Sequence, residues 1–222
     1  MSLDQVRTVL VQTHHPGNIG SAARALKTMG LTQLQLVNPI AFPSDEATKL
    51  AAGAADILEA AAVADELDQV LGDTQLVVAC TARPRGFDLP ELTPEQAARR
   101  LLQQAEQGPV AILYGPERFG LSNQHLEHAR YRVTIPANPM YPSLNLAAAV
   151  QVVSYEFRRH LMRHKPEKPR GRKHMQDVLA SNDELNKMFE HLDQALDSLG
   201  VFGRNNPDVM MRRIKGILTR SS

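Results

Sequence analysis

Short apolar runs rich in β-branched residues alternate with helical patterns over the first 160 residues, and this alternation most constrains how the chain can fold. Five runs have the length and composition of strands: VRTVLVQ (6–12), LQLVN (34–38), LVVAC (76–80), VAILYG (110–115) and YRVTI (131–135). Strands that alternate with helices usually form a parallel sheet covered on both faces. The pattern therefore predicts an α/β domain with a mostly parallel sheet flanked by helices.

Helical patterns occupy the stretches between these runs. IGSAARALKTMG closes at Gly30, ATKLAAGAADILEAAAVA is interrupted near Gly53, and PEQAARRLLQQAEQ follows the start signal Thr93-Pro94. The domain is expected to end with the helix LNLAAAVQVVSYEFRRHLM, with Ser143 as its N-cap. A chain of 222 residues, 43% of them hydrophobic, can bury one full core and a small appendage.

A second helical pattern follows the main domain and predicts that appendage. SNDE, starting at Ser181, has the form of a capping box, and the helix after it is expected to stop at Gly200. One apolar face of this helix is formed by Leu185, Met188, Phe189, Leu192, Leu196 and Leu199. A final helix is expected to start at Pro207, with Asn206 as its N-cap. The predicted organisation is a main domain over 1–163, a basic linker over 164–180 and a helical extension over 181–222.

The formal net charge of +1 averages two unlike regions. Residues 158–173 carry eight Lys and Arg against the single acid Glu167, whereas the rest of the chain has 17 basic and 23 acidic residues. A basic arm on an acidic body is a candidate contact for the phosphates of a nucleic acid. The alternative is a solvated linker that its charges keep extended.

Several classes of protein are disfavoured by what the sequence lacks. No stretch approaches the roughly 20 apolar residues of a membrane span, and the first residues do not resemble a secretory signal. The single cysteine, Cys80, allows no internal disulfide. No clustering of zinc ligands, Walker loop or serine-hydrolase elbow is present, and no metal is expected. We expect a cytoplasmic protein with no membrane contact.

Ligands of parallel α/β domains usually bind at the carboxyl ends of the strands, so the loops after the strands are the candidate sites. In THHPGNIGSAARALK, Gly17 and Gly20 surround Asn18 at a helix start, where small residues let another backbone or a phosphate come close. Arg24 lies four residues after Gly20 and could reach back over this turn, or could be an ordinary surface residue. The adjacent His14 and His15 are more typical of hydrogen-bonding surface groups than of a catalytic pair.

Two further loops are unusual in their glycines and prolines. In YGPERFGLSNQHL, Gly115 and Gly120 bracket Glu117 and Arg118, and Ser122 can cap the next helix. In IPANPMYPSLNLAAA, three prolines in eight residues hold the backbone extended before the last helix of the domain. Such a segment is shaped in advance, which lowers the entropy lost when a ligand or another strand packs against it.

NIGSAARALKTMGL, LYGPERFGL and IPANPMYPSLNLAAAVQVVSYE, in this order, resemble the three motifs of the SpoU branch of the SPOUT RNA methyltransferases. The resemblance covers residues 5 to about 160, and VLVQTHHPGNIGSAARALKTMGLTQLQLVNP followed by AAGAADIL is similar to the enzymes that methylate the 2′-oxygen of cytidine or uridine 32 in tRNA. The segment FEHLDQALDSLGVFGRNNPDVMMRRIKGIL is similar to their helical C-terminal extension. Phe119 and Pro142 depart from that pattern, at positions where a small residue and a serine are common.

The resemblance implies a fold, a cofactor and partners. The C-terminal part of the domain would form a trefoil knot, and S-adenosylmethionine would bind within it. The enzyme would be a homodimer that contacts tRNA and no DNA. The helix after Ser143 would contribute to the dimer contact, because it is apolar over more than one face, through Leu144, Leu146, Ala147, Ala148, Val150 and Val153.

The resemblance also implies the residues of the site. The cofactor would lie against Cys80, Thr81, Ala82, Gly115, Ile135, Met140, Ser143 and Leu144. Arg24 would help activate the ribose hydroxyl or orient a phosphate, and Glu117 is a competing candidate for handling the proton. Asn18, Glu117 and Asn145 match the family's polar positions around the site, and Ser143 is a further candidate for the reaction. Taken alone, Thr81 could be a strand-end cap, and Cys80 is better explained as a buried small residue than as a nucleophile.

Two other functions are compatible with the motifs. A SpoU enzyme that acts on ribosomal RNA would share all three of them, and a substrate screen would distinguish it. A non-catalytic RNA-binding protein would keep the basic arm without needing the cofactor loops, and the affinity for S-adenosylmethionine would separate that class.

Overall fold

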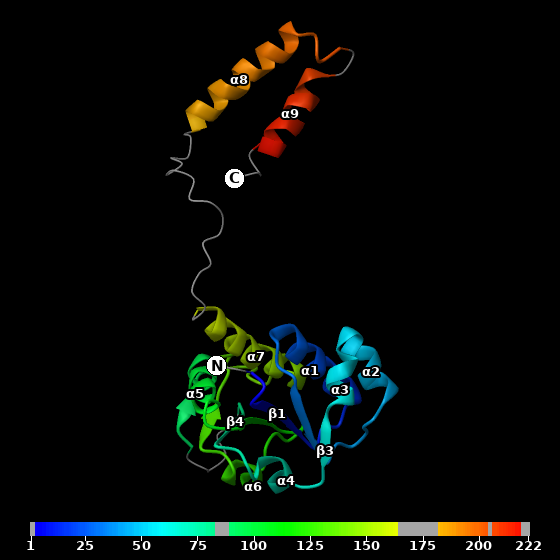
Figure 1. Ribbon diagram of the computed structural model, residues 1–222, viewed down its shortest axis with the longest axis vertical. Coiled ribbons are helices and arrows are strands. Elements are labelled where there is room, and N and C mark those ends of the chain that lie inside the picture. Colours follow the sequence, from blue (N-terminus) through cyan, green and yellow to red (C-terminus); the bar gives the residue numbers. More distant parts are fainter. Residues whose placement is uncertain (1–2, 83–88, 164–181, 204–205, 219–222) are drawn as a thin grey trace. The chain divides into compact units, whose positions relative to one another are not determined.

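The protein is described here by a computed structural model of residues 3–82, 89–163, 182–203 and 206–218. Within these residues, seven parallel strands form one sheet in the order β3-β2-β1-β6-β4-β7-β5 (Figure 1). The strands are β1 (Val6–Val11), β2 (Gln33–Val37), β3 (Ala62–Ala64), β4 (Leu76–Cys80), β5 (Glu91–Leu92), β6 (Val110–Tyr114) and β7 (Tyr131–Val133). The predicted parallel α/β fold is therefore confirmed.

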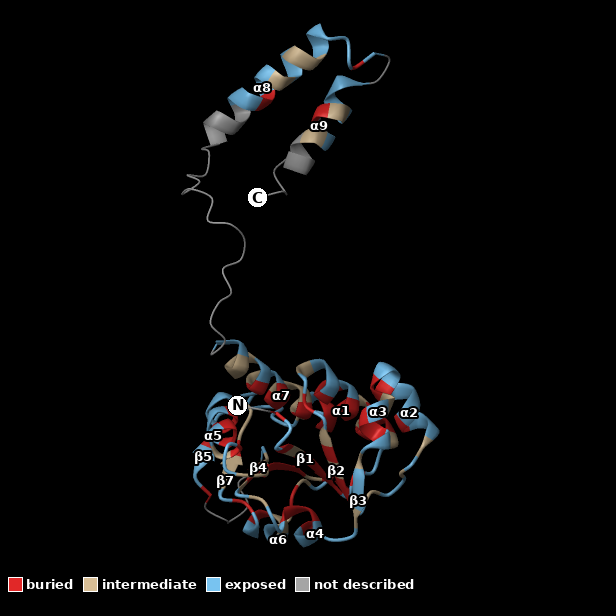
Figure 2. Ribbon diagram, in the orientation of Figure 1, coloured by how far each residue is buried: buried red, intermediate tan, exposed pale blue. Residues whose placement is uncertain are grey.

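Helices cover both faces of this sheet (Figure 1). One face carries α1 (Pro16–Met29), α2 (Asp45–Ala51), the 3-10 turn η1 (Ala52–Ala54), α3 (Ala55–Glu59), α5 (Pro94–Gln104) and α7 (Leu146–Arg163). The other carries α4 (Leu67–Leu71) and α6 (Asn123–Glu127). The central strands are buried on both sides, as parallel strands between two helical layers must be (Figure 2).

The side chains of β6 alternate between the two hydrophobic cores on either side of the sheet. Val110, Ile112 and Tyr114 point into the core under α1, α5 and α7, whereas Ala111 and Leu113 point into the core under α4 and α6. The alternation follows from the two-residue period of a strand. All five residues are buried, which explains why the sequence shows a continuous apolar run here rather than alternation.

The predicted strands and helix ends agree with the structure except at the short elements. All five predicted strands form, and Gly30 ends α1 at a φ of 84° as expected. Residues 62–64, predicted to continue a helix, form β3 instead, because they pair with β2 at the edge of the sheet. The two-residue strand β5, which pairs with β7, was not predicted. Helix α1 also starts earlier than predicted, at Pro16, where the fixed φ of proline suits a first turn.

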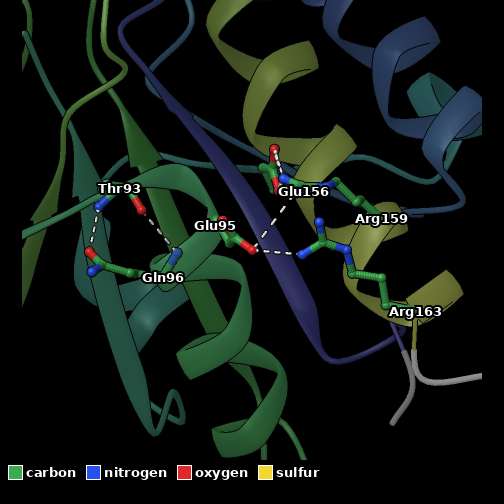
Figure 3. A network of polar contacts seen from close by, with 6 residues as sticks. All are labelled: Thr93, Glu95, Gln96, Glu156, Arg159 and Arg163. Carbon is green, nitrogen blue, oxygen red and sulfur yellow. Dashed lines mark hydrogen bonds and ion pairs between the residues drawn. The ribbon is translucent and has the colours of Figure 1, made fainter.

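Helices α5 and α7 are joined by charged side chains (Figure 3). A capping box of Thr93 and Gln96 starts α5, with Thr93 Oγ1 accepting from the Gln96 N–H at 3.2 Å. Glu95, in the first turn of α5, accepts a hydrogen bond from Arg163 at 2.9 Å. Arg159 lies 3.9 Å from the same Glu95 oxygen and binds Glu156 at 2.8 Å. Two arginines of the predicted basic arm are therefore paired with acids of this chain. Residues 164–173 of the arm lie outside the described residues.

The chain divides into two compact units, residues 1–166 and 167–222. The second unit contains α8 (Asn182–Ser198) and α9 (Pro207–Leu218), which contact each other. Asn206 caps α9 as predicted, since its Oδ1 accepts from the Asp208 N–H at 2.9 Å, and Gly200 follows the end of α8 at a φ of 68°. The linker 164–180 and the cap Ser181 lie outside the described residues.

The packing of α8 agrees only in part with its predicted apolar face. Phe189 is buried and Leu192 and Leu196 are half-buried, whereas Met188 and Leu199 are exposed. Leu199 lies beyond the last residue of the helix, so the helical period no longer fixes its direction. None of the described helices is both long enough and apolar enough to cross a membrane.

Candidate functional site

A cavity of about 340 Å³ opens at the carboxyl ends of β4 and β6. Its walls come from three separate stretches: the residues after β4, the loop after β6, and the segment from β7 into α7. The lining residues are Cys80, Thr81, Ala82, Tyr114, Gly115, Pro116, Glu117, Arg118, Phe119, Gly120, Ile135, Met140, Tyr141, Pro142, Ser143, Leu144, Leu146 and Ala149. The volume lies within the range of sites that bind small molecules.

The cavity gathers every residue that the sequence assigned to cofactor binding. Cys80, Thr81 and Ala82 come from the end of β4, and Gly115 from the end of β6. The remaining four, Ile135, Met140, Ser143 and Leu144, come from the segment that precedes α7. The structure thus brings together residues that lie up to 64 positions apart in the sequence.

Gly115 allows the loop after β6 to turn tightly at the cavity wall. A Cβ at this position would lie closer than 3.0 Å to backbone atoms of Gly120 and Leu121, so no larger residue fits without moving the loop. Gly120 itself has a φ of 66°, a conformation that glycine adopts without strain. Ser122 then caps α6 as predicted, its hydroxyl accepting from the His125 N–H at 3.2 Å.

The proline-rich segment forms a tight turn at the mouth of the cavity. The Asn138 carbonyl accepts from the Tyr141 N–H at 2.9 Å, and the Asn138 side chain accepts from the Met140 N–H at 3.0 Å. Pro139 stands second in this four-residue turn, where the fixed φ of proline is favoured. The turn directs Met140 and Tyr141 outward, since both side chains are exposed.

A chain of hydrogen bonds connects the loops after β1 and β6 with the start of α7. Asn145 Nδ2 donates to Asn18 Oδ1 at 2.9 Å, and Asn18 Nδ2 donates to Glu117 Oε1 at 2.7 Å. The carboxylate of Glu117 also accepts from the backbone N–H groups of His14 at 3.0 Å and His15 at 3.2 Å. The three polar residues expected near the reaction are therefore bonded to one another.

Glu117 is held in its ionised form by these donors. Partial burial raises the pKa of Glu117, but the hydrogen bonds from Asn18, His14, its own backbone and His15 together outweigh burial and lower the pKa below its ordinary value of 4.5. A carboxylate with a lowered pKa is a weaker base. The arrangement therefore favours a role for Glu117 in fixing the loops. It disfavours Glu117 as the acceptor of the substrate proton.

Asn145, rather than Ser143, caps α7. Its Oδ1 accepts from the N–H groups of Ala147 at 2.9 Å and Ala148 at 3.3 Å, which are otherwise unbonded at the helix start. The predicted cap at Ser143 is wrong, because α7 begins only at Leu146, three residues after Ser143. Ser143 instead lines the cavity with an exposed side chain.

The glycines of the first loop serve helix packing. A Cβ on Gly20 would lie closer than 3.0 Å to backbone atoms of Ala47 and Ala51, and one on Gly17 would lie 2.7 Å from side-chain atoms of Glu46 and Leu50. Of the two explanations that the sequence left open, the close neighbour is therefore another backbone, that of α2. The Gly20 side of α1 is closed to a phosphate.

Arg24 does not line the cavity. Its side chain is exposed on α1, where it shares an outward stripe with Asn18 and Ser21, and it makes no hydrogen bond or ion pair with the residues that the structure describes. Gly20 faces α2 instead, so the arginine does not fold back over the glycine turn. Arg24 is available to a partner that approaches the Asn18 end of α1.

Two groups at the cavity wall, the half-buried Cys80 and the buried Tyr114, are poor proton donors. Burial raises the pKa of the Cys80 thiol to about 12 and, together with the nearby Cys80, holds the pKa of Tyr114 well above its usual range. Cys80 therefore stays a neutral thiol at physiological pH, which argues against a nucleophile, as the sequence suggested. No group of metal-ligating side chains occurs among the described residues.

Several residues of the cavity were not among the predicted site residues, chiefly Arg118, Phe119 and Tyr141. Each stands next to a residue that the sequence had singled out: Arg118 beside Glu117, Phe119 beside Gly120, and Tyr141 beside Met140. The available signal was their place in the loops that run from Gly115 to Gly120 and from Pro139 to Pro142. Tyr114 gave no such signal, since it looks like any other residue of a buried strand.

Comparisons with known proteins agree on one family. The sequence profile of the SpoU rRNA Methylase family matches residues 5–155. The chain is 44% identical over 220 residues to the tRNA (cytidine/uridine-2′-O-)-methyltransferase TrmJ of Pectobacterium atrosepticum. The alignment covers 99% of this chain and 90% of that protein.

Solved structures give the same result. TrmJ from Z. mobilis ZM4 superposes with a TM-score of 0.69 at 36% identity, covering 97% of this chain and 91% of the other. An AdoMet-bound rRNA methyltransferase from Sinorhizobium meliloti superposes with a TM-score of 0.56 at 25% identity, covering 71% of this chain and 57% of the other.

Proposed function

Because this chain belongs to the SpoU rRNA methylase family, we propose that it methylates the ribose 2′-hydroxyl of cytidine or uridine in tRNA, at nucleotide 32 of the anticodon loop, with S-adenosylmethionine as methyl donor. The name of the relative that is 44% identical over 99% of this chain supports tRNA and the two pyrimidines. Position 32 rests on the resemblance of the first loop to enzymes with that target.

The cavity carries this proposal. Eight residues expected at the cofactor come together around it, and no other part of the sequence was assigned that task. Its walls fit S-adenosylmethionine chemically: Ile135, Met140 and Leu144 offer apolar contact to an adenine ring, and the hydroxyls of Thr81 and Ser143 offer polar contacts. Bound there, S-adenosylmethionine would supply a sulfonium methyl group: an oxygen would attack the methyl carbon in line with the C–S bond, and the sulfur would leave as a neutral thioether.

Positioning is the main contribution that this chain can make. Alignment of two reacting groups is worth about 7–11 kcal/mol, whereas a positioned base typically adds about 10²- to 10⁴-fold. The bonded chain Asn145–Asn18–Glu117 supports this assignment, because it fixes three loops around one opening. Ser143 lies at the cavity and is free to contact the ribose.

Arg24 is proposed to stabilise charge rather than to remove a proton. A guanidinium is almost always protonated, so it suits the developing alkoxide or a neighbouring phosphate better than the role of a base. Arg24 lies outside the cavity lining of its own chain. Its role therefore requires that the RNA, or a second copy of the chain, bring the reacting groups to it.

We infer further that the segment from β6 to α7 forms the trefoil knot of SPOUT enzymes and that two copies associate. Most apolar residues first expected at the dimer contact, Leu146, Ala147, Val150 and Val153, are buried in the core of their own chain. The outward stripe of α7 that remains contains Ala148, Val152, Tyr155 and Met162. Sedimentation of the wild-type chain and of Tyr155→Asp tests this, with a fall to the monomer mass expected for the variant.

The decisive experiment measures transfer of labelled methyl groups from S-adenosylmethionine to unmodified tRNA transcripts. Label is expected on the wild-type transcript and not on one with a 2′-deoxyribose at nucleotide 32. Arg24→Ala is expected to lose transfer while its cofactor affinity stays the same, and Lys49→Ala, an exposed cation elsewhere, is expected to keep both. If label appeared on ribosomal RNA fragments and none on tRNA, the proposed substrate would change from tRNA to ribosomal RNA.

A further inference from the structure

Large exposed side chains gather at the mouth of the cavity, and two of them, Phe119 and Tyr141, are not among the proposed cofactor contacts. Phe119 is 65% exposed and Tyr141 78% exposed, and both line the cavity. Met140 beside them is 89% exposed. Aromatic rings that are exposed singly are common on proteins, but two of them from different loops at one opening indicate a contact surface.

The turn from Asn138 to Tyr141 holds Tyr141 in place before any ligand arrives. Two hydrogen bonds to Asn138, at 2.9 and 3.0 Å, close the turn, and Pro139 and Pro142 restrict the backbone on either side of Met140 and Tyr141. A ring presented on a rigid turn loses little conformational entropy when something stacks on it.

Arg118 places a positive charge at the same opening. Its side chain is exposed, lines the cavity, and makes no hydrogen bond or ion pair within the described part of the chain. The adjacent carboxylate of Glu117 forms no ion pair with it and instead accepts from Asn18, His14 and His15. A guanidinium without an acidic partner, next to aromatic rings, fits a nucleotide that offers both a phosphate and a base.

We propose that Tyr141 stacks on the base of the nucleotide to be methylated and that Arg118 binds a phosphate next to it. This inference rests on the proposed function and adds how the target nucleotide is held. Cytidine and uridine present opposite donor and acceptor groups at N3 and at position 4 of the base, so a site that takes both cannot depend on hydrogen bonds to those two groups. Stacking accepts any base face and is compatible with both pyrimidines.

The test of Tyr141 combines a protein change with an RNA change. Tyr141→Ala is expected to lower kcat/KM roughly 5- to 150-fold, the equivalent of one stacked base, whereas Tyr141→Phe keeps the ring and stays close to wild type. On a tRNA with an abasic ribose at the target position, Tyr141→Ala and wild type are expected to react at the same rate. An equal penalty on the abasic and the natural tRNA would overturn the stacking role.

A spectroscopic readout separates stacking from structural support. Pyrrolocytidine at the target position is expected to lose fluorescence on binding to wild type and to Tyr141→Phe, and to keep it on binding to Tyr141→Ala. For Arg118→Ala, the slope of log affinity for tRNA against log salt concentration is expected to fall by about one, as when a single phosphate contact is removed. An unchanged slope would remove Arg118 from the proposal.

Controls distinguish failure of this inference from failure of the proposed function. Because Arg118 and Tyr141 line the cofactor cavity, the affinity of each variant for S-adenosylmethionine is measured first and transfer is compared at saturating cofactor, with the wild-type chain as reference. A Tyr141→Ala chain that sediments as a smaller species, with the same penalty on abasic tRNA, would assign Tyr141 to a contact between two copies and overturn its contact with RNA. Absence of transfer by the wild-type chain would count against the proposed function itself.

Discussion

Single glycines decide how closely α1 approaches its neighbours. Gly20→Ala would place a Cβ against backbone atoms of Ala47, which cannot move aside as a flexible side chain can. We expect a loss of stability of about 2–3 kcal/mol, toward the upper end of overpacking changes. Gly53→Ala is the matched control, because no atom lies within 4 Å of a Cβ there. Urea denaturation of both variants measures the difference, and equal stability of the two would contradict the close packing.

The carboxylate of Glu117 makes stability depend on pH in a defined direction. Glu117→Gln keeps the shape but leaves one acceptor oxygen for three donors, and we expect a cost of about 1–2 kcal/mol at pH 7. Since the pKa of Glu117 is lowered in the folded chain, its contribution is full above the ordinary value of 4.5 and is lost as the pH falls through the folded pKa.

The measurement is the free energy of unfolding of wild type and Glu117→Gln between pH 7 and pH 3.5. The gap between them is expected to narrow below pH 4.5. Glu106→Gln, at an exposed carboxyl that makes no hydrogen bond or ion pair with the described residues, serves as the control and is expected to change stability little. If the difference in unfolding free energy between wild type and Glu117→Gln stayed constant over the whole pH range, the hydrogen bonds would not be what lowers the pKa of Glu117.

Residue-scale prediction worked where chemistry alone decides and failed where a tertiary neighbour decides. Gly30, Ser122 and Asn206 act as expected, because a left-handed residue or a short polar cap is needed locally. Ser143 and Asn145 are both good caps, and the choice between them depends on Asn18, which bonds Asn145 across 127 positions of sequence. Likewise, the helical period gave the position of Arg24 on α1. It could not show which side of α1 is covered by α2.

The start of α7 connects a helix cap to the proposed site. Asn145→Ala removes both the cap and the bond to Asn18, whereas Asn145→Ser restores a cap without that bond. We expect Ala to cost about 1 kcal/mol of stability and Ser to recover most of it. Methyl transfer is expected to fall in both variants, because the chain to Glu117 is broken in both. Full transfer by Asn145→Ser, measured beside its unfolding free energy, would show that the cap alone matters.

Strands in the interior of the sheet were predictable, and strands at its edges were not. The five strands found from the sequence occupy the five inner positions of the sheet; β1, β2, β4 and β6 have five or six residues, whereas β7 has three, of which only Val133 is buried. Strands β3 and β5 lie at the two edges of the sheet with three and two residues, and they exist only because a neighbouring strand pairs with them. Their own residues carry too little local preference to predict them.

At the scale of the whole molecule, the cavity belongs to one compact unit. All its lining residues lie between Cys80 and Ala149, inside the unit 1–166. A fragment of residues 1–166 is therefore expected to bind S-adenosylmethionine with a Kd within about threefold of the full chain. Isothermal titration of both proteins measures this, and an affinity more than about tenfold weaker in the fragment would place part of the cofactor site in residues 167–222.

The distribution of charge is also a property of the whole chain rather than of its basic arm. The excess of Lys and Arg over 158–173 suggested a phosphate contact, but Arg159 and Arg163 bind Glu95 and Glu156. Counting charges along the sequence cannot show this, since Glu95 lies on another helix. Among the described residues of the arm, Arg158 is exposed and in no ion pair.

The walls of the cavity come from residues 80–149, and this sets the order of events when the chain is made. Synthesis proceeds from the N-terminus, so β1, β2 and β4 have left the ribosome well before the turn at Asn138 and the first residues of α7 exist. Until then the opening has no far wall. S-adenosylmethionine consequently cannot guide the early steps of folding, but once α7 is in place it stabilises the finished domain by mass action, by an amount that grows with the logarithm of its concentration above the Kd.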